Sequence, residues 1–261
     1  IHAAALLSCL RQAMPVQDAD MARFTTALAD GRFFFERETW HDLHGGGTGR
    51  AIGEMLLRVQ DETGRTLPQE SAIRSIGAAG LNALLDTALV LAALEQAIAQ
   101  DEFPVSVNVS AQQAGDPVFW NSLEGHISQY FGPRLRPADV IFEFTEDGAA
   151  ENPAHATLMA LRDKGYRFAI DDLSHHAMEG LSRLDDPAGS KGGGPAITEA
   201  RRLRNLAPYA DFIKLDGKSV LAASQGDFAM HDFLLMIRQE TGRPGVAILA
   251  EWVDSLGQAV R

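Results

Sequence analysis

The chain has 261 residues, of which 46% are hydrophobic, so it is long enough to bury a sizeable core in one barrel-sized domain or in two smaller ones. Its formal charge of −12 at pH 7 makes it a poor surface for duplex nucleic acid, which normally needs a basic face. Cys9 is the only cysteine, so there is no intramolecular disulfide framework, which fits a reducing compartment such as the cytoplasm.

The predicted elements begin with residues 1–30, a helix or linker that enters from an upstream part of a longer protein. Residues 32–40 and 51–59 are predicted strands with a Gly-rich turn between them, and their hairpin-like spacing makes the pair antiparallel. Helices are expected at 69–79 and 84–100, and the second is apolar enough to pack on a sheet. No uninterrupted apolar run approaches the length of a membrane span.

Strands and helices alternate from residue 104 onward. Further strands are predicted at 104–109, 140–144, 167–171, 211–215 and 246–251. Further helices are predicted at 117–131, 153–164, 177–184 and 226–241, with another from Asp254. Such alternation favours a parallel α/β sheet, and its length favours a (β/α)₈ barrel over residues 31–261.

Two segments depart from a regular barrel. Residues 185–208 form a long excursion where a short connection is usual, and EARRLRNLA within it has helical character. The chain also ends soon after the seventh predicted strand, so we expect the last strand to be missing and the C-terminal end to be incomplete.

Carboxylates, an amide and a lysine stand within or at the end of these apolar runs. They are Glu54, Asn108, Glu143, Asp171, Asp172, Lys214 and Glu251. Because strand side chains alternate between faces, and because (β/α)₈ barrels carry their active sites at the C-terminal strand ends, we expect these side chains to gather there. Oxygen-only ligands suit hard cations such as Mg²⁺ or Mn²⁺, and two such ions stabilise the in-line displacement of a phosphoryl group.

Several of these residues also have a plainer interpretation. Glu54, taken alone, is compatible with a surface residue or a paired structural charge. Asp171 and Asp172 are compatible with a simple cap at a strand end, because Asp is common before helices. Lys214 is compatible with an ion pair to Glu251 inside the barrel. His175 resembles a metal ligand, but with its neighbour His176 it is better interpreted as an exposed loop residue.

Six motifs in this order resemble those of the EAL domain family of bacterial cyclic-di-GMP phosphodiesterases. They are Glu54-Met55-Leu56 for EAL, Asn108-Val109-Ser110 for NLS, Glu143-Phe144-Thr145-Glu146 for ExTE, Asp171-Asp172 for the start of DDFG, Ile213-Lys214-Leu215-Asp216 for IKID and Ala250-Glu251-Trp252-Val253-Asp254 for AEGVE. The resemblance extends over residues ~33–254. It implies a TIM-like (β/α)₈ barrel of EAL type with an antiparallel first strand.

The resemblance also implies roles for single residues. Glu54, Asn108, Glu143 and Asp171 would hold one Mg²⁺ or Mn²⁺ ion, and Asp171 and Asp172 would serve the second, with Glu251 binding metal or its water. Glu54, Lys214 and Glu251 would be catalytic, with Lys214 orienting the water or the phosphate and Glu251 available as the base. Arg58, Asp172 and Asp254 would contact the substrate, and Glu146 would brace the neighbouring loop.

The implied reaction is a two-metal hydrolysis of cyclic-di-GMP to linear pGpG in the bacterial cytoplasm, in a cytoplasmic or membrane-attached protein. The implied partners are a second copy of the chain in a homodimer and an upstream sensory or GGDEF-type domain.

Two departures from the family's motifs favour an alternative function. Residues 36–39 replace the family's YQPI segment, and DDLSHHAMEG replaces DDFGTGYSS and loses both of its glycines. The alternative is a catalytically degenerate EAL domain that acts as a cyclic-di-GMP receptor or protein-interaction module; an unrelated barrel acting on another phosphoester is a further one.

Overall fold

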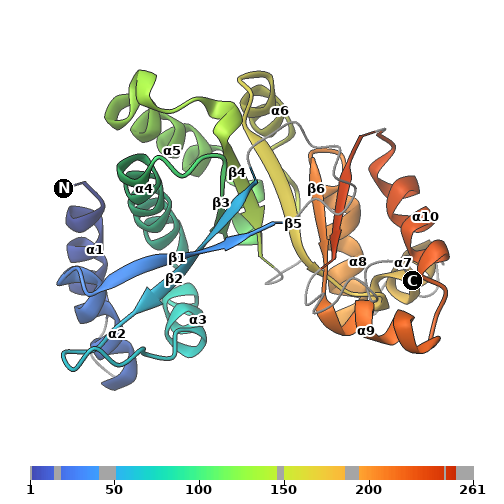
Figure 1. Cartoon of the computed structure of the whole chain (residues 1–261), viewed down its shortest axis with the longest axis horizontal. Coiled ribbons are helices and arrows are strands. Elements are labelled where there is room, and N and C mark those ends of the chain that lie inside the picture. The colour runs from blue at the N-terminus through green and yellow to red at the C-terminus, as the bar shows by residue number, and fades with distance from the viewer. Residues whose placement is uncertain are drawn as a thin grey trace. The chain divides into compact units, whose positions relative to one another are not determined.

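The computed structural model describes residues 2–14, 19–40, 51–145, 150–185, 194–243 and 245–250. Within them the fold is α/β, with a seven-stranded sheet whose strand order follows the chain (Figure 1). The strands are β1 (Phe33–Thr39), β2 (Gly53–Val59), β3 (Val105–Val109), β4 (Val140–Phe144), β5 (Arg167–Leu173), β6 (Phe212–Leu215) and β7 (Ala247–Ala250). β1 pairs with β2 in antiparallel fashion, as predicted, and the pairs β2–β3, β4–β5, β5–β6 and β6–β7 are parallel.

The helices lie between these strands as the alternating pattern predicts. They are α1 (His2–Ala13), α2 (Ala19–Ala29), α3 (Glu70–Ala78), α4 (Asn82–Gln100), α5 (Pro117–Tyr130), α6 (His155–Asp163), α7 (His176–Asp185), α8 (Pro195–Leu206), α9 (Gly217–Gln225) and α10 (Met230–Thr241), with short 3₁₀ turns at Ala111–Gly115, Gly132–Arg134 and Pro137–Asp139. The chain folds into two compact units. The first contains α1–α4, β1, β2, residues 105–108 and residues 121–140, and the second contains residues 109–120 and the chain from Ile141 through β7.

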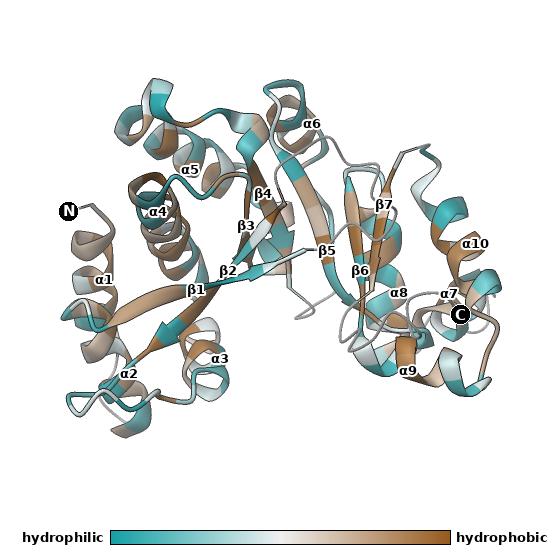
Figure 2. Ribbon diagram, viewed as in Figure 1, coloured by the Kyte–Doolittle hydropathy of each residue, from teal (hydrophilic) through white to brown (hydrophobic). Residues whose placement is uncertain are grey.

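The core of the first unit packs α1 and α2 against α4 and β2. Leu10 of α1, Phe24 of α2 and Val59 of β2 are almost fully buried there, together with Leu85 of α4. Figure 2 shows α4 as the most uniformly apolar helix of this unit. Among the described helices, α4 alone is long and apolar enough to cross a membrane, but 56% of its apolar window is buried inside the protein, which is typical of a core helix.

The core of the second unit is aromatic. The indole of Trp120, on α5, makes edge contacts with Phe142, Phe144 and Phe168 at centroid distances of 5.2, 5.9 and 5.7 Å. Its Nε1 donates a hydrogen bond of 2.8 Å to the carbonyl of Gln113, so the one polar atom of the ring is satisfied. Phe142 and Phe144 therefore face the helix layer, as the alternation along the fourth strand predicts.

Three predicted elements differ from the structure. The helix predicted at 226–241 begins later, at Met230, as α10. A helix that was not predicted, α9, precedes it: Asp216 caps α9 by accepting a 2.9 Å bond from the Ser219 N–H, and Gly226 ends it in the left-handed conformation. The helical region predicted at 1–30 is also two helices, α1 and α2. β5 continues to Leu173, two residues beyond the predicted end. The helix expected within the excursion at 185–208 is confirmed as α8.

Candidate functional site

Three charged side chains from adjacent strands meet in the second unit. The Nζ atom of Lys214, on β6, lies 2.6 Å from Oε1 of Glu143 on β4 and 2.8 Å from Oδ1 of Asp171 on β5. The side chain of Glu143 is fully buried and that of Lys214 is 5% exposed. Buried charges of this kind persist only when they are paired in good geometry. The structure therefore brings together three residues that the sequence places in the site, with Lys214 bridging two carboxylates.

The chain bends sharply beside this trio. Asp172 has φ of +46°, in the left-handed region that costs an L-residue about 1–2 kcal/mol. The β5–β6 register shifts between Ile170 and Leu173, which marks a bulge. The Asp172 N–H donates a 3.0 Å bond to Oδ1 of Asp171, the same oxygen that Lys214 contacts. The bend thus orients the Asp171 carboxylate through the Asp172 N–H. The left-handed φ at Asp172 also changes the direction of the backbone between the two aspartates.

Two further predicted ligands lie in the first unit. Glu54 is buried, and its Oε2 accepts a bond of 3.3 Å from Nε1 of Trp40. The Oδ1 atom of Asn108, near the end of β3, is buried and has no hydrogen-bond partner in the described structure. A buried acceptor without a partner is unusual in a folded protein and is consistent with a group that binds an ion.

The donor set has the chemistry of a hard-cation site. All of its members in the described residues offer carboxylate or amide oxygens, the ligands preferred by Mg²⁺ and Mn²⁺. The orphaned Asn108 oxygen fits the same ligand class. Within the described parts of the chain, no three carboxylate, imidazole or thiol groups converge closely enough to hold a metal. Glu146, Glu251 and Asp254 lie outside the described residues.

Arg58, the predicted phosphate contact, already has an anionic partner. Its Nε lies 2.7 Å from Oε2 of Glu36. In the β1–β2 register Arg58 stands opposite Phe34, so Glu36 is its diagonal neighbour across the two strands. A bound phosphate would have to compete with this carboxylate. The sequence shows that residues 36–39 differ from the YQPI segment of the EAL family. Only the strand register reveals that Glu36 pairs with Arg58.

Arg37 lies across Gly53, the residue before the predicted catalytic Glu54. Its guanidinium donates bonds of 2.9 Å to Oγ1 of Thr39 and 2.9 Å to the carbonyl of Ala51. It crosses Gly53 so closely that a Cβ atom on Gly53 would lie 2.0 Å from Nε of Arg37. The absence of a side chain at Gly53 is what allows Arg37 to lie there.

The altered loop after Asp172 is packed against α9 and against Phe228, which lies between α9 and α10. The His175 N–H donates a 2.8 Å bond to Oγ of Ser219, and Nδ1 of the same histidine lies 2.9 Å from that oxygen. The ring also stacks on Phe228 at 4.6 Å. Burial, and then the neighbouring His176, lower the pKa of His175. The prediction of an exposed loop residue is therefore wrong for His175, which is partly buried. His176 is exposed, as predicted, but it begins helix α7 and does not lie in the loop.

Helix α8 supplies two contacts that the sequence does not reveal as part of the site. Arg202 is 1% exposed and donates to the carbonyls of Asp171 and Asp172 at 2.7 and 3.2 Å. Glu199 accepts a bond from the backbone N–H of Ser174 and a 2.7 Å bond from its hydroxyl. The i, i+3 spacing of Glu199 and Arg202 within an amphipathic helix is the available signal, but it does not show which strand they reach.

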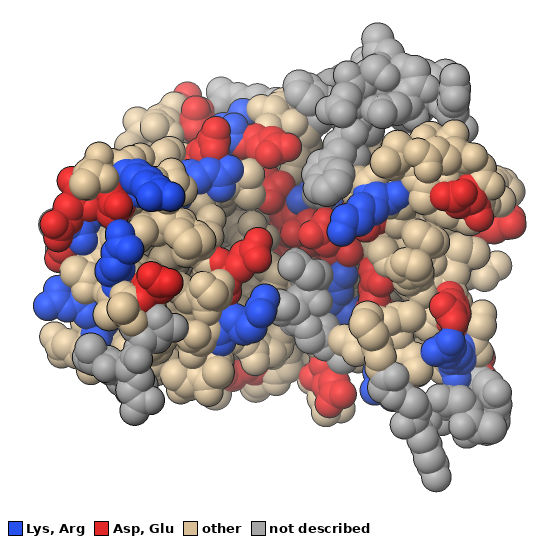
Figure 3. Space-filling view, turned by 90° about the horizontal axis from the view of Figure 1, so that it is seen from below, with Lys and Arg blue, Asp and Glu red and all other residues tan. Residues whose placement is uncertain are grey.

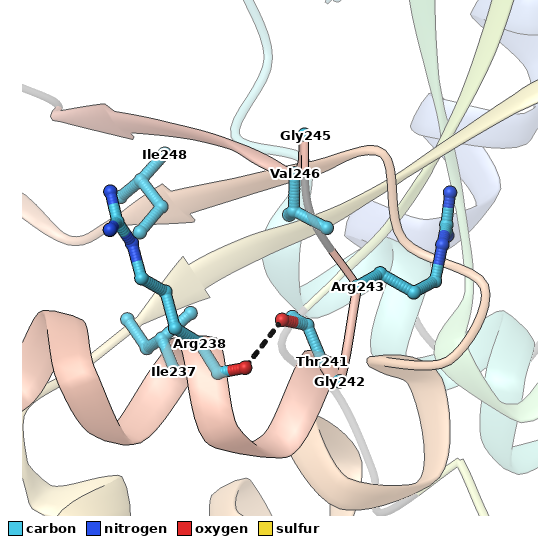
Figure 4. Close-up of a pocket in the computed structure, with 8 residues that line it drawn as sticks. All are labelled: Ile237, Arg238, Thr241, Gly242, Arg243, Gly245, Val246 and Ile248. Atoms are coloured by element: carbon cyan, nitrogen blue, oxygen red, sulfur yellow. Dashed lines mark hydrogen bonds between the residues drawn. The ribbon is translucent and has the colours of Figure 1, made fainter.

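A separate hollow lies between α10 and β7, toward the N-terminal end of β7. Figure 4 shows Arg238 and Arg243 on either side of it, and the only bond drawn runs from Oγ1 of Thr241 to the carbonyl of Arg238 at 3.0 Å. Its lining is Ile237, Arg238, Thr241, Gly242, Arg243, Gly245, Val246 and Ile248. Because the trio around Lys214 comes from C-terminal strand ends, this hollow is distinct from the candidate site.

Acidic and basic side chains are interspersed over the face drawn in Figure 3, among the described residues, without a broad basic patch.

Comparison with known proteins supplies a family and a fold. The family model described as "EAL domain" matches residues 23–185, which is more than half of the chain. No curated protein sequence matches the chain.

Three solved structures illustrate the shared fold. The FimX EAL domain from Pseudomonas aeruginosa, bound to c-di-GMP, has 16% identity and a TM-score of 0.61, with 93% of this chain and 88% of that one covered. The PaMucR phosphodiesterase in its c-di-GMP complex has 18% identity and a TM-score of 0.62, with 92% and 88% covered. Vibrio cholerae LapD, an S helix-GGDEF-EAL structure bound to c-di-GMP, has 16% identity and a TM-score of 0.59, with 90% of this chain and 51% of that one covered.

Proposed function

We propose that this chain, which belongs to the EAL domain family, hydrolyses cyclic-di-GMP to linear pGpG. The family and the c-di-GMP-bound neighbours support a cyclic-di-GMP-related role. The observation that carries the finer proposal is the buried trio, in which Lys214 lies 2.6 Å from Glu143 and 2.8 Å from Asp171. A receptor that only binds the nucleotide has little need of so costly a buried arrangement at the strand ends.

The proposed reaction is the addition of one water molecule across a phosphodiester. The oxygen of the water forms a bond to phosphorus, the bond from phosphorus to O3′ breaks, and O3′ takes up a proton. Negative charge develops on the phosphoryl oxygens, and a preorganised cation stabilises it best in a site that excludes water. The Lys214 ammonium, buried and oriented by two carboxylates, is the described cation suited to that role.

EAL domains are in general metal-dependent, and the donor chemistry described above fits Mg²⁺ or Mn²⁺. When bound, two such ions would activate water and offset charge on the leaving oxygen. We propose that Glu54, Asn108, Glu143, Asp171 and Asp172 hold them, together with Glu251. Burial of Glu54 and Glu143 keeps these carboxylates in a fixed place before an ion arrives.

A receptor without turnover is the second candidate, and the replaced segments at 36–39 and after Asp172 favour it. The Glu36–Arg58 pair bears on nucleotide affinity under either function. The pair has an Nε–Oε2 distance of 2.7 Å and withdraws a guanidinium that would otherwise bind phosphate. Because the Glu36 side chain is 60% exposed, the pair is weak enough for a ligand to break. It therefore favours lower nucleotide affinity more than it favours loss of binding.

Cyclic-di-GMP incubated with the protein and Mn²⁺, followed by chromatography of the products, separates these functions. We expect pGpG from the wild type and none from Glu54→Ala, whose folding is checked by its thermal melt. Glu62→Ala, at an exposed turn, is the matched control and should cleave normally. If calorimetry shows binding of cyclic-di-GMP but no pGpG forms, the receptor function remains and hydrolysis is refuted. If cyclic-di-GMP does not bind, both functions are refuted.

The setting of the protein is also a proposal. We propose that it acts in the cytoplasm, as a homodimer and downstream of a sensory or GGDEF-type domain. The GGDEF-EAL arrangement of LapD supports the last point.

A further inference from the structure

We infer that Arg202 of α8 is a positioning residue that sets the Asp171–Asp172 bend for ion binding; the inference rests on the proposed function. Its guanidinium donates to the carbonyl of Asp171 at 2.7 Å and to that of Asp172 at 3.2 Å. A third contact of 3.5 Å reaches the carbonyl of Phe144, at the end of β4. One side chain from a helix thus hydrogen-bonds the backbone carbonyls at the ends of β4 and β5, the two strands that carry Glu143, Asp171 and Asp172.

The burial of Arg202 shows that this grip is built into the fold. Its exposure is 1%, among the lowest of any charged residue in the described chain. Removing a guanidinium from water costs several kcal/mol unless its donors find acceptors. Arginine presents five donors in a rigid planar fork, which suits several carbonyls held at fixed positions better than a lysine would.

The carbonyls that Arg202 binds belong to the irregular part of β5. The ladder between β5 and β6 is interrupted between Ile170 and Leu173, and Asp171 and Asp172 lie within that interruption. The left-handed φ of +46° at Asp172 is a strained conformation, which persists only when its surroundings determine it. Arg202 supplies that constraint through the two carbonyls.

A second contact from the same helix holds the chain immediately after the bend. Glu199, one turn before Arg202, binds the N–H and the hydroxyl of Ser174. The two residues therefore fix the segment 171–174 from one helix face, with Arg202 holding carbonyls and Glu199 holding donors. Because backbone direction sets where a short Asp side chain can point, this clamp determines the orientation of the two carboxylates.

The same helix offers a matched control. Arg204 is joined to Glu240 of α10 at 3.2 Å and to Asp185 of α7 at 3.0 Å, and it contacts neither strand end in these bonds. Arg204→Met removes the same type of side chain from α8 while leaving the clamp intact.

The test is a Mn²⁺ titration followed by electron paramagnetic resonance on Arg202→Met, Arg202→Lys, Arg204→Met and the wild type. Residues that orient metal ligands typically change metal affinity by about 10–100-fold, so we expect a loss of that size for Arg202→Met and a smaller loss for Arg202→Lys. Arg204→Met should bind Mn²⁺ as the wild type does. In the cleavage assay we expect Arg202→Met to lower kcat far more than it raises KM.

A purely structural role would lower the urea midpoint of Arg202→Met and leave Mn²⁺ affinity unchanged, and that result overturns the inference. If the Met variant does not fold, Arg202→Lys decides, and wild-type Mn²⁺ affinity in it overturns the inference. A wild type that binds Mn²⁺ without forming pGpG refutes the proposed hydrolysis alone, and the role of Arg202 then stands or falls on the affinities. A wild type that does not bind Mn²⁺ overturns both.

Discussion

Replacing Lys214 by Met should destabilise the protein strongly. The substitution keeps the length of the side chain but leaves the fully buried Glu143 carboxylate without its ammonium partner at 2.6 Å. Removing one member of a buried ion pair typically costs about 3–5 kcal/mol, because the other charge stays in a low-dielectric place. Asp171 loses a contact of 2.8 Å in the same step, so the upper part of that range is expected.

Urea unfolding and calorimetry measure this cost. For a chain of this size each kcal/mol lowers Tm by about 2–4 °C, so a loss of about 4–5 kcal/mol lowers Tm by roughly 8–20 °C. Lys218→Met is the matched control, since Lys218 is exposed on α9 and its loss should change stability by less than about 0.5 kcal/mol.

Added Mn²⁺ sharpens the test. A divalent ion that binds the two carboxylates should restore part of the stability of Lys214→Met, because any ligand that binds only the folded state stabilises it. Mg²⁺ should act in the same direction, and Na⁺ at equal ionic strength should not. A loss below about 1 kcal/mol for Lys214→Met would refute the reasoning, since it would place the ammonium where water already screens it.

Three further changes are predicted from single contacts. Glu36→Gln should raise affinity for cyclic-di-GMP by about 1.5–5-fold in calorimetry, since an exposed pair with Arg58 is worth about 0.2–1 kcal/mol. The pKa of His175 lies below its ordinary 6.5, so the unfolded chain binds more protons and thermal stability should fall as pH drops below 6.5; His175→Gln should flatten that decline in melts from about pH 8 to 5. Gly180→Ala should lower the stability measured by urea unfolding by about 1–3 kcal/mol, because its Cβ would lie 2.0 Å from the carbonyl oxygen of Ala196.

Each of these has its own control and contrary result. Glu62→Gln should leave nucleotide affinity unchanged, and an unchanged affinity in Glu36→Gln would mean that ligand does not meet Arg58. His231→Gln, at an exposed position, should keep the pH dependence of the wild type; if His175→Gln keeps it as well, another group causes the decline. Gly125→Ala, with open space around its position, should be neutral or stabilising, and equal behaviour of both glycines would contradict close α7–α8 packing.

The sheet can be predicted because its signal is local. Alternation of apolar and polar residues gives each strand, and the hairpin spacing gives the antiparallel start. The division of residues 217–241 into two helices also has a local signal, since Asp216 three residues before Ser219 and the later Gly226 form a recognisable cap and stop. The cap is hard to recognise in the sequence, because Asp216 directly follows an apolar strand and so resembles the last residue of the IKLD motif.

The site can be predicted only in part. The residues that converge, Glu143, Asp171 and Lys214, all stand at predicted strand ends. The partner of Arg58 and the grip of Arg202 cannot be predicted, because each depends on a register or a docking that pairs residues far apart in sequence, 22 and about 30 positions respectively. Long-range polar contacts of that kind have no signature in a single sequence.

Gly53 and Arg37 carry a consequence for how this sequence can change. Because the Arg37 guanidinium passes where a Cβ on Gly53 would stand, any other residue at 53 must displace it from Thr39 and Ala51. The two positions are therefore expected to covary among descendants of this chain, with a larger residue at 53 accepted only after Arg37 has been replaced. Because the order of the two steps is fixed, position 53, next to Glu54 in β2, should change slowly in evolution. It is also a poor first target for randomised libraries.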